Sequence, residues 1–155
     1  MTESPGELDE IDHTILRILA QDPRTPYSDI ATRLEEEGYQ MSSEGIRYRV
    51  SKLFETTSVQ LMTAPKEHGW EVMRLLIRIE DGTPKEETFD RLTEMAFWMV
   101  CRVMGNFDFY VVATVPSNRE ADDLISRVRE IDSVASVEHA IETDRETNTD
   151  NYLSF

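Results

Sequence analysis

The sequence predicts an α+β protein in two parts: an N-terminal (winged) helix-turn-helix half and a C-terminal ferredoxin-like half with the element order βαββαβ. Two observations carry this prediction. Apolar residues recur with a helical period over the first 62 residues, whereas strand-like alternation, interrupted by two helical segments, dominates after residue 72. We therefore expect domains at residues 1–62 and 73–155, joined by a linker at residues 63–72.

The first half is expected to contain three short helices and a small wing. Apolar residues between Leu8 and Leu19 define the first helix, with Asp9 as its N-cap and an end near Gln21. Ser28 is the expected cap of the second helix, which Gly38 ends. Residues 59–62 are expected to form the strand of a wing.

The third helix, residues 42–54, combines an apolar stripe with a local group of cations. Ile46, Val50 and Leu53 fall at the i, i+4, i+7 spacing of one buried face. The rest of the helix can meet phosphate and bases, as a recognition helix does. The candidate DNA-binding residues on it are Ser42, Ser43, Arg47, Tyr48, Arg49, Ser51 and Lys52.

Each of these residues also has an alternative role. The pattern of residues 42–54 is also typical of an ordinary amphipathic helix with solvated charges. Arg49 flanks the packed face, where it is placed to form an ion pair with Asp9 or Asp12 of the first helix. The two roles for Arg49 predict different neighbours.

The second half alternates four strands with two helices. The expected strands cover Leu75–Ile79, Trp98–Met104, Phe107–Val115 and Val134–Ile141, and the expected helices bury Phe89, Leu92 and Met95 in one case and Leu124, Ile125, Val128 and Ile131 in the other. Two helices cover only one face of a four-stranded sheet. The other face is expected to be apolar, and a second copy packed against it is the natural cover.

Composition narrows the function classes. The chain has 155 residues and a net charge of −15, and only three of its sixteen basic residues are lysine. Such a field repels nucleic acid in dilute buffer, but this acid-rich, lysine-poor surface resembles that of proteins from halophilic archaea, where molar salt shortens the Debye length to about 3 Å. In that setting a local cationic cluster can hold DNA.

Several other classes find no support in the residues. Cys101 is the single cysteine and the three histidines are scattered, so no disulfide, metal site or cofactor is predicted. No set of residues combines an acid, a base and a nucleophile, so we expect no catalytic residues and no enzyme. Neither a signal peptide nor an apolar membrane span is present, and we expect a cytoplasmic protein.

Three motifs resemble the Lrp/AsnC (feast/famine) family of transcription regulators over nearly the whole chain. Leu8-Asp9-x-x-Asp12-x-x-Ile15-Leu16 is similar to the opening helix of the family, and Ser42-x3-Ile46-x2-Arg49-Val50-x2-Leu53 is similar to its recognition helix. Gly105-Asn106-Phe107-Asp108-Phe109-Tyr110 resembles the strand entry of its effector domain. The resemblance implies a homodimer, often assembled into tetramers or octamers, that binds pseudo-palindromic promoter DNA and responds to amino acids.

The resemblance places the effector-binding residues in the loop before the third strand, at Gly105, Asn106, Phe107 and Asp108. There Gly105 allows close approach of a ligand and Asp108 can receive an ammonium group. The alternative is an ordinary β-turn, for which Gly-Asn is a common signal.

Three departures from the family pattern bear on function. Extra residues at 35–40 lengthen the turn before the recognition helix, residues 59–62 lack the basic residue expected in a wing, and Asn106 replaces a frequent aspartate. Two other readings share this architecture: a tetrapyrrole decarboxylase of the sirohaem type that binds no DNA, and a small-molecule sensor without DNA binding. The deficit of cations in residues 61–155 disfavours a tetracarboxylate ligand.

Overall fold

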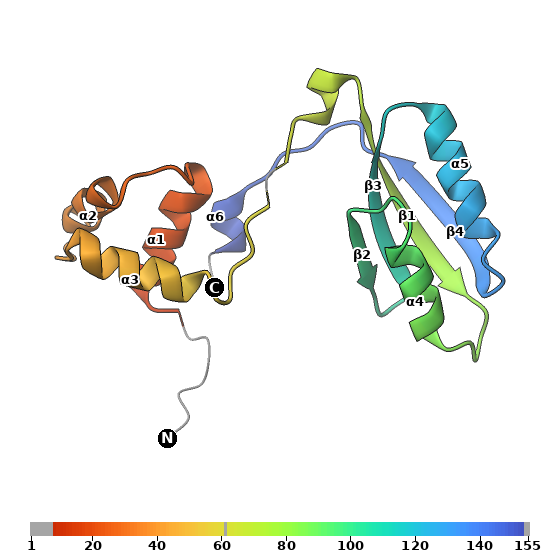
Figure 1. Ribbon diagram of the computed structural model, residues 1–155, viewed down its shortest axis with the longest axis horizontal. Coiled ribbons are helices and arrows are strands. Elements are labelled where there is room, and N and C mark those ends of the chain that lie inside the picture. Colours follow the sequence, from red (N-terminus) through yellow and green to blue (C-terminus); the bar gives the residue numbers. More distant parts are fainter. Residues whose placement is uncertain (1–7, 61, 154–155) are drawn as a thin grey trace. The chain divides into compact units, whose positions relative to one another are not determined.

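The structure, a computed structural model, describes residues 8–60 and 62–153 and divides into two compact units (Figure 1). The helical unit comprises Met1–Leu61 and Glu146–Phe155, and the sheet unit comprises Met62–Arg145. The predicted boundary at residue 62 differs by one residue. The end of the chain differs more, because residues 146–155 group with the helical unit and not with the predicted second domain.

The helical unit is built from α1 (Glu10–Gln21), α2 (Tyr27–Glu36), α3 (Ser43–Leu53) and the short α6 (Thr149–Tyr152). The predicted start of α1 is confirmed: Asp9 accepts a hydrogen bond of 2.8 Å from the Asp12 backbone N–H, and Asp12 returns the bond in a capping box. The predicted cap of α2 is wrong, because the helix begins one residue before Ser28, after Pro26. Proline presets the backbone dihedral there and has no backbone N–H of its own to satisfy.

The core of the helical unit lies between its three longer helices. Ile15, Ile30, Leu34 and Ile46 are fully buried in it. The partly buried Leu153 packs against this cluster. The C-terminal segment therefore contributes to the core of the helical unit through this residue.

The predicted wing is absent from the part of residues 59–62 that the structure describes. Residues 59, 60 and 62 are in no strand, and Leu61 lies outside the described residues. Val59 and Met62 are exposed. A strand needs a neighbour to satisfy its backbone groups, and the alternation over four residues carried no information about one. Regular structure resumes with a 3₁₀ turn, η1 (Pro65–His68).

The sheet unit confirms the predicted βαββαβ order. It contains β1 (Glu71–Ile79), α4 (Lys85–Thr93), β2 (Met99–Arg102), β3 (Phe109–Val115), α5 (Asn118–Arg129) and β4 (Val134–Ile141). The antiparallel strands lie in the order β2-β3-β1-β4, with α4 and α5 against the same face. Because β1 begins at Glu71, the predicted linker at 63–72 is shorter than expected.

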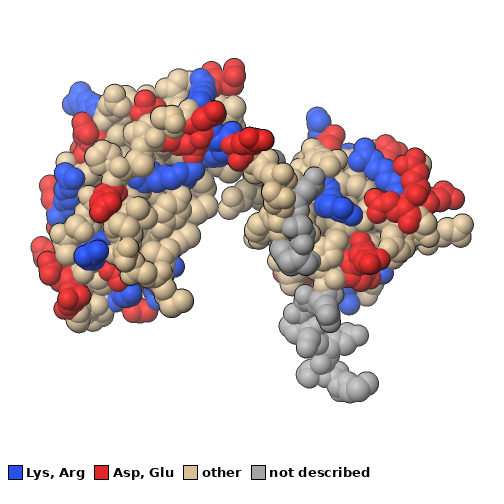
Figure 2. Space-filling model, turned by 180° about the vertical axis from the view of Figure 1, so that it is seen from behind, with Lys and Arg blue, Asp and Glu red and all other residues tan. Residues whose placement is uncertain are grey.

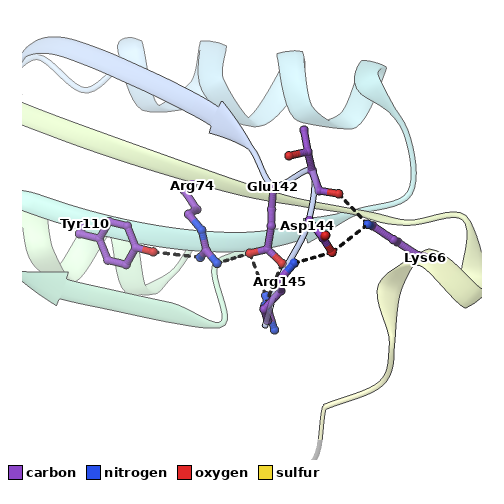
Figure 3. Close-up of polar contacts among 7 residues, drawn as sticks. Lys66, Arg74, Tyr110, Glu142, Asp144 and Arg145 are labelled. Carbon is purple, nitrogen blue, oxygen red and sulfur yellow. Dashed lines mark hydrogen bonds and ion pairs between the residues drawn. The ribbon is translucent and has the colours of Figure 1, made fainter. Parts of the chain in front are cut away.

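The face of the sheet away from the helices carries a polar cluster that the sequence did not predict (Figure 3). Arg74 donates to the Tyr110 hydroxyl at 2.9 Å and pairs with Glu142, which also pairs with Arg145 at 2.8 Å. Val112 is fully buried although it shares this face with Arg74. The open face is therefore only partly apolar.

Two arginines govern the charge of Glu142 in this polar cluster. Partial burial alone would raise the pKa of Glu142, but Arg145 and Arg74 outweigh burial and hold the pKa below its ordinary value. A carboxylate shared by two guanidinium groups stays ionised, so the polar cluster keeps a fixed charge pattern on the open face.

Candidate nucleic-acid interface and hairpin site

The inner face of α3 is anchored as its apolar spacing predicts. Ile46, Val50 and Leu53 are 0%, 3% and 5% exposed. Ser42 is the N-cap and accepts a hydrogen bond of 3.2 Å from the Gly45 backbone N–H. Because this stripe is buried and the first turn is capped, the orientation of the remaining α3 side chains is fixed relative to α1 and α2.

The outer face of α3 presents most of the predicted DNA-binding side chains to solvent. Tyr48 is 67% exposed, and the Arg47 side chain is 66% exposed with only a loose contact of 3.6 Å to Glu44. The other exposed members of the predicted set are Ser42, Ser43, Ser51 and Lys52. Exposed donors and cations on one side of a firmly packed helix match what contact with a duplex requires.

Arg49 differs from its neighbours, and the structure favours its alternative role. Its Nη1 lies 2.7 Å from Asp9 and 2.8 Å from Asp12, and its side chain is 27% exposed. Partial burial would raise the pKa of Asp9, but hydrogen bonds from Asp12 and Arg49 lower it overall. The assignment of Arg49 to DNA is therefore revised: it ties α3 to the start of α1, because its position on the helix faces that pair of carboxylates.

The lengthened turn between α2 and α3 is held against α1. The Thr14 hydroxyl donates to Glu37 at 2.9 Å, and the Tyr39 hydroxyl donates to Glu10. Gly38 adopts a left-handed φ of 93° that ends α2. Two of the extra residues thus turn toward α1, whereas Glu35 lies beside Gln40 and Ser42 at a shallow depression near the start of α3.

Charge is distributed unfavourably for nucleic acid outside α3. On the face shown in Figure 2, Lys and Arg side chains are scattered among Asp and Glu side chains. Residues 1–60 contain six basic and twelve acidic residues, a formal charge of −6. Attraction to phosphate must therefore act at short range. It would come from Arg47, which has a loose contact with Glu44, and from the exposed Lys52.

The predicted effector residues form the loop of the β2–β3 hairpin. Gly105 has a φ of 139°, which favours glycine. The Asn106 carbonyl oxygen accepts two bonds from Arg78, of 2.9 and 3.1 Å, and the side chain of Phe107 is half-buried. The turn alternative thus describes the backbone correctly, and Arg78 of β1 fixes the tip.

Asp108 has partners for both carboxylate oxygens. Oδ2 accepts the Ile79 backbone N–H at 3.0 Å, and Oδ1 lies 2.7 Å from Lys85 Nζ at the start of α4. These two contacts, with Lys85 contributing most, hold the pKa of Asp108 below its ordinary value. The carboxylate predicted to receive an ammonium group is therefore already paired with the chain's own ammonium.

Lys85 and Arg78 are site residues that sequence reasoning missed. The sequence did contain a signal for Lys85. A cation is unfavourable at a helix N-terminus, yet Lys85 stands there, directly before two glutamates that suit this position. Nothing in the alternation of β1 marked Arg78, because an outward arginine is ordinary in a strand with one solvated face.

Two further features of the described residues bear on the function classes. Residues 8–60 and 62–153 include no group of His, Cys, Asp or Glu side chains arranged to hold a metal ion. No helix in the same part of the chain has the length and apolar character needed to cross a bilayer.

Comparisons with known proteins agree with this architecture. Residues 8–53 match the model of the AsnC-type helix-turn-helix domain, so this part of the chain is such a domain. A relative from Pyrococcus horikoshii, named an uncharacterized HTH-type transcriptional regulator, is 27% identical and aligns over 88% of this chain and 87% of its own length. The HTH-type transcriptional regulator LysM of Sulfurisphaera tokodaii is 24% identical over 88% of this chain and 95% of its own.

Solved structures show the same fold across both units. Escherichia coli AsnC superposes with a TM-score of 0.76 at 21% identity, covering 92% of this chain and 97% of its own. A feast or famine regulatory protein from M. tuberculosis, complexed with L-methionine, superposes with a TM-score of 0.75 at 23% identity, covering 92% of this chain and 96% of its own. At these identities the likeness establishes the fold, a helix-turn-helix domain followed by a ferredoxin-like domain.

Proposed function

We propose that this chain is a sequence-specific DNA-binding transcription regulator of the Lrp/AsnC type. The observation that carries the proposal is the AsnC-type domain at residues 8–53, whose third helix is anchored by a buried stripe and exposes Arg47, Tyr48, Ser51 and Lys52. A helix of this kind fits the major groove, where the two cations contact phosphate or guanine and the hydroxyl groups contact base edges. Both curated relatives named above are called transcriptional regulators.

The regulator acts as a homodimer that packs the open faces of two sheet units together. Leu76, Met99 and Cys101 share this face and are half-buried in a single chain, so a second copy would remove further apolar surface from water. In the polar cluster of Arg74, Tyr110, Glu142 and Arg145, the Glu142 carboxylate pairs with both guanidinium groups, and the interface must accommodate the remaining net charge of +1. Two subunits then read half-sites about one helical turn apart.

Dimerisation has its own test. Leu76→Asp places a charge at the centre of the open face and is expected to give monomers in sedimentation velocity. Ser126→Asp, at an exposed position of α5 on the other side of the sheet, is the control and should leave the dimer intact. A wild-type monomer, or a Leu76→Asp dimer, would contradict this interface.

Modulation by an amino acid belongs to the same proposal. The M. tuberculosis protein of this fold is complexed with L-methionine, and the hairpin residues Gly105, Asn106, Phe107 and Asp108 are the candidate effector site here. The enzyme alternative lacks a comparable observation, since the relatives from Pyrococcus horikoshii and Sulfurisphaera tokodaii are both named transcriptional regulators. A sensor without DNA binding predicts ligand binding and no contact with DNA.

The test is chromatin immunoprecipitation of the tagged chain in its own cells, where the internal salt is the native one. Wild type should give promoter peaks that share an inverted repeat, and a chain carrying Arg47→Ala and Lys52→Ala should lose them at equal abundance. Peaks that survive the double substitution would overturn the assignment to α3, and a wild type without peaks would overturn the function.

We also propose that the chain works in a cytoplasm of high salt. A net charge of −15 repels itself when unscreened, so the free energy of unfolding should rise as KCl is raised from 0.1 to 2 M. Denaturation followed by circular dichroism at several KCl concentrations measures this. A chain that is equally stable in dilute buffer would contradict a halophilic setting.

A further inference from the structure

The hairpin site holds a fixed carboxylate and a replaceable cation. Asp108 is held by three short contacts, two of them to β1: its backbone N–H donates to Ile77 at 2.9 Å, and its Oδ2 accepts from Ile79 at 3.0 Å. The third crosses the hairpin, where its carbonyl oxygen accepts from Val103 at 2.9 Å. Its side chain is 20% exposed, whereas that of Lys85 is 47% exposed. Of the two partners, the lysine is therefore the one that can leave.

Lys85 is poorly placed for its own helix. It is the first residue of α4, where the helix dipole disfavours a cation, and Glu86 and Glu87 beside it are the residues that suit this end. Glu86 makes a separate contact of 2.7 Å with Arg102 of β2. The start of α4 is thus joined to the hairpin strands twice, and only the Lys85 contact involves a residue that the helix itself disfavours.

We propose that Lys85 is a tethered competitor at Asp108 and that the hairpin therefore selects zwitterionic amino acids over simple amines. This inference rests on the proposed effector function of the hairpin. An ammonium group that reaches Asp108 displaces Lys85 and leaves an unpaired cation beside it. An α-amino acid brings a carboxylate that pairs with the displaced Lys85, whereas an amine leaves it unpaired.

Arg78 strengthens this selection. Its Nε and Nη2 are engaged with the Asn106 carbonyl oxygen, at 3.1 and 2.9 Å, and its charge also acts on Asp108. The groups around the hairpin tip are thus one carboxylate and two cations. A ligand with one ammonium and one carboxylate matches them, and its binding breaks the Lys85–Asp108 contact while the Glu86–Arg102 contact remains.

Removal of Lys85 should abolish the preference. In Lys85→Ala, an amine meets Asp108 without a competitor and should bind about three- to fivefold more tightly than to wild type, as expected for loss of a partly exposed ion pair. The matching amino acid loses the cation for its carboxylate and gains little. The ratio of the two affinities should therefore fall in Lys85→Ala and be retained in Lys85→Arg.

The experiment measures thermal shifts of the full chain with each of the twenty L-amino acids and with the amines that lack their carboxylates. Arg91→Ala is the matched control, because it removes one cation from the same helix, where Arg91 makes only an exposed contact of 3.8 Å with Glu87. Lys85→Ala lies at an exposed helix start and should fold normally. Asp108→Asn should bind neither class.

The outcomes separate this inference from the proposed function. A fall in the ratio confined to Lys85→Ala supports the inference. The inference is overturned if the ratio is the same in Lys85→Ala and Arg91→Ala, or if Lys85→Ala binds no tested amine. DNA binding is measured separately, by fluorescence anisotropy without ligand, and should be unchanged in Lys85→Ala. If the wild-type protein does not bind DNA in that assay, the regulator function is overturned, and the measured ligand preference still stands.

Discussion

The outer face of α3 and the β2–β3 hairpin were both predicted as binding sites, and they differ in how their charges are used within the chain. On α3 the Arg47 side chain is mostly solvated, with one loose contact at 3.6 Å. In the hairpin Asp108 already has an ion pair at 2.7 Å and a backbone hydrogen bond. The first surface can bind a partner at the loss of only this loose contact, whereas the second must exchange a short ion pair.

The same contrast separates two arginines on one helix. Arg47 faces solvent, and Arg49, two residues later, joins Asp9 and Asp12. The two side chains point about 200° apart around the helix axis. Neighbouring cations in the sequence can therefore have different roles, one facing a DNA partner and the other stabilising the fold. Substitutions at the two positions should therefore affect different properties.

The largest effect is expected in the packing beneath α3. Ile46→Ala removes a fully buried side chain and should lower the free energy of unfolding of the helical unit by about 3 kcal/mol. Hydrogen exchange by mass spectrometry should show the loss of protection in α1–α3 and not in the sheet unit, whose core is a separate cluster. Ile77→Ala is the matched control and should show the reverse. Equal loss in both units would contradict their independence.

The second effect concerns the cations that face solvent. Arg47→Ala with Lys52→Ala should weaken DNA binding about a hundredfold and make the slope of log affinity against log salt shallower by about two, because two phosphate contacts are lost. Fluorescence anisotropy on duplexes selected with wild type measures both. Arg119→Ala with Arg129→Ala changes the net charge equally on α5 and should have little effect. An equal loss in this control would indicate a general charge effect.

The third effect tests Arg49 through pH. Arg49→Ala should lower the free energy of unfolding by about 1 kcal/mol at pH 7, since the ion pairs are partly exposed. The pKa of Asp9 in the fold lies below its ordinary value of 3.8, so the stabilisation is complete above that value and is lost as the pH falls below it toward the folded pKa. Urea unfolding of both proteins from pH 7 to 2.5 should show the difference vanish only in acid. A difference already lost at pH 6 would exclude this pair as its cause.

The last effect, similar in size to that of Arg49→Ala, concerns the hairpin backbone. Gly105→Ala meets no heavy atom within 4 Å but must adopt a φ of 139°, so it should cost about 1 kcal/mol through the backbone alone. Thermal unfolding of the full chain measures the loss. Gly45→Ala in α3 has no such φ and should not show this cost, although its Cβ would meet Met41 at 3.2 Å. Unchanged stability in Gly105→Ala would show that the loop relaxes.

Local patterns in the sequence were sufficient for the elements and for most of the exposed surface of α3. The capping box at Asp9, the N-cap at Ser42 and the bounds Val134–Ile141 all follow from residues close together in the chain. The wing and the start of α2 were predicted wrongly because the residues nearby in the chain were not sufficient there. Four alternating residues cannot show whether a partner strand exists. A proline, whose side chain has no hydrogen-bond acceptor, is easily overlooked as a cap beside a serine.

The sequence by itself determined the two-part α+β organisation, the buried and exposed faces of α3, and the position of the hairpin loop, because each depends on periodicity or turn residues within a few positions of one another. Only the tertiary structure decided which charges were already paired. Arg49 and Asp12 are 37 positions apart, Lys85 and Asp108 are separated by the rest of α4 and by β2, and Leu153 reaches a core formed by residues at the start of the chain. An ion pair or a packing contact depends on distance in space, and the folded chain sets that distance independently of the separation in sequence.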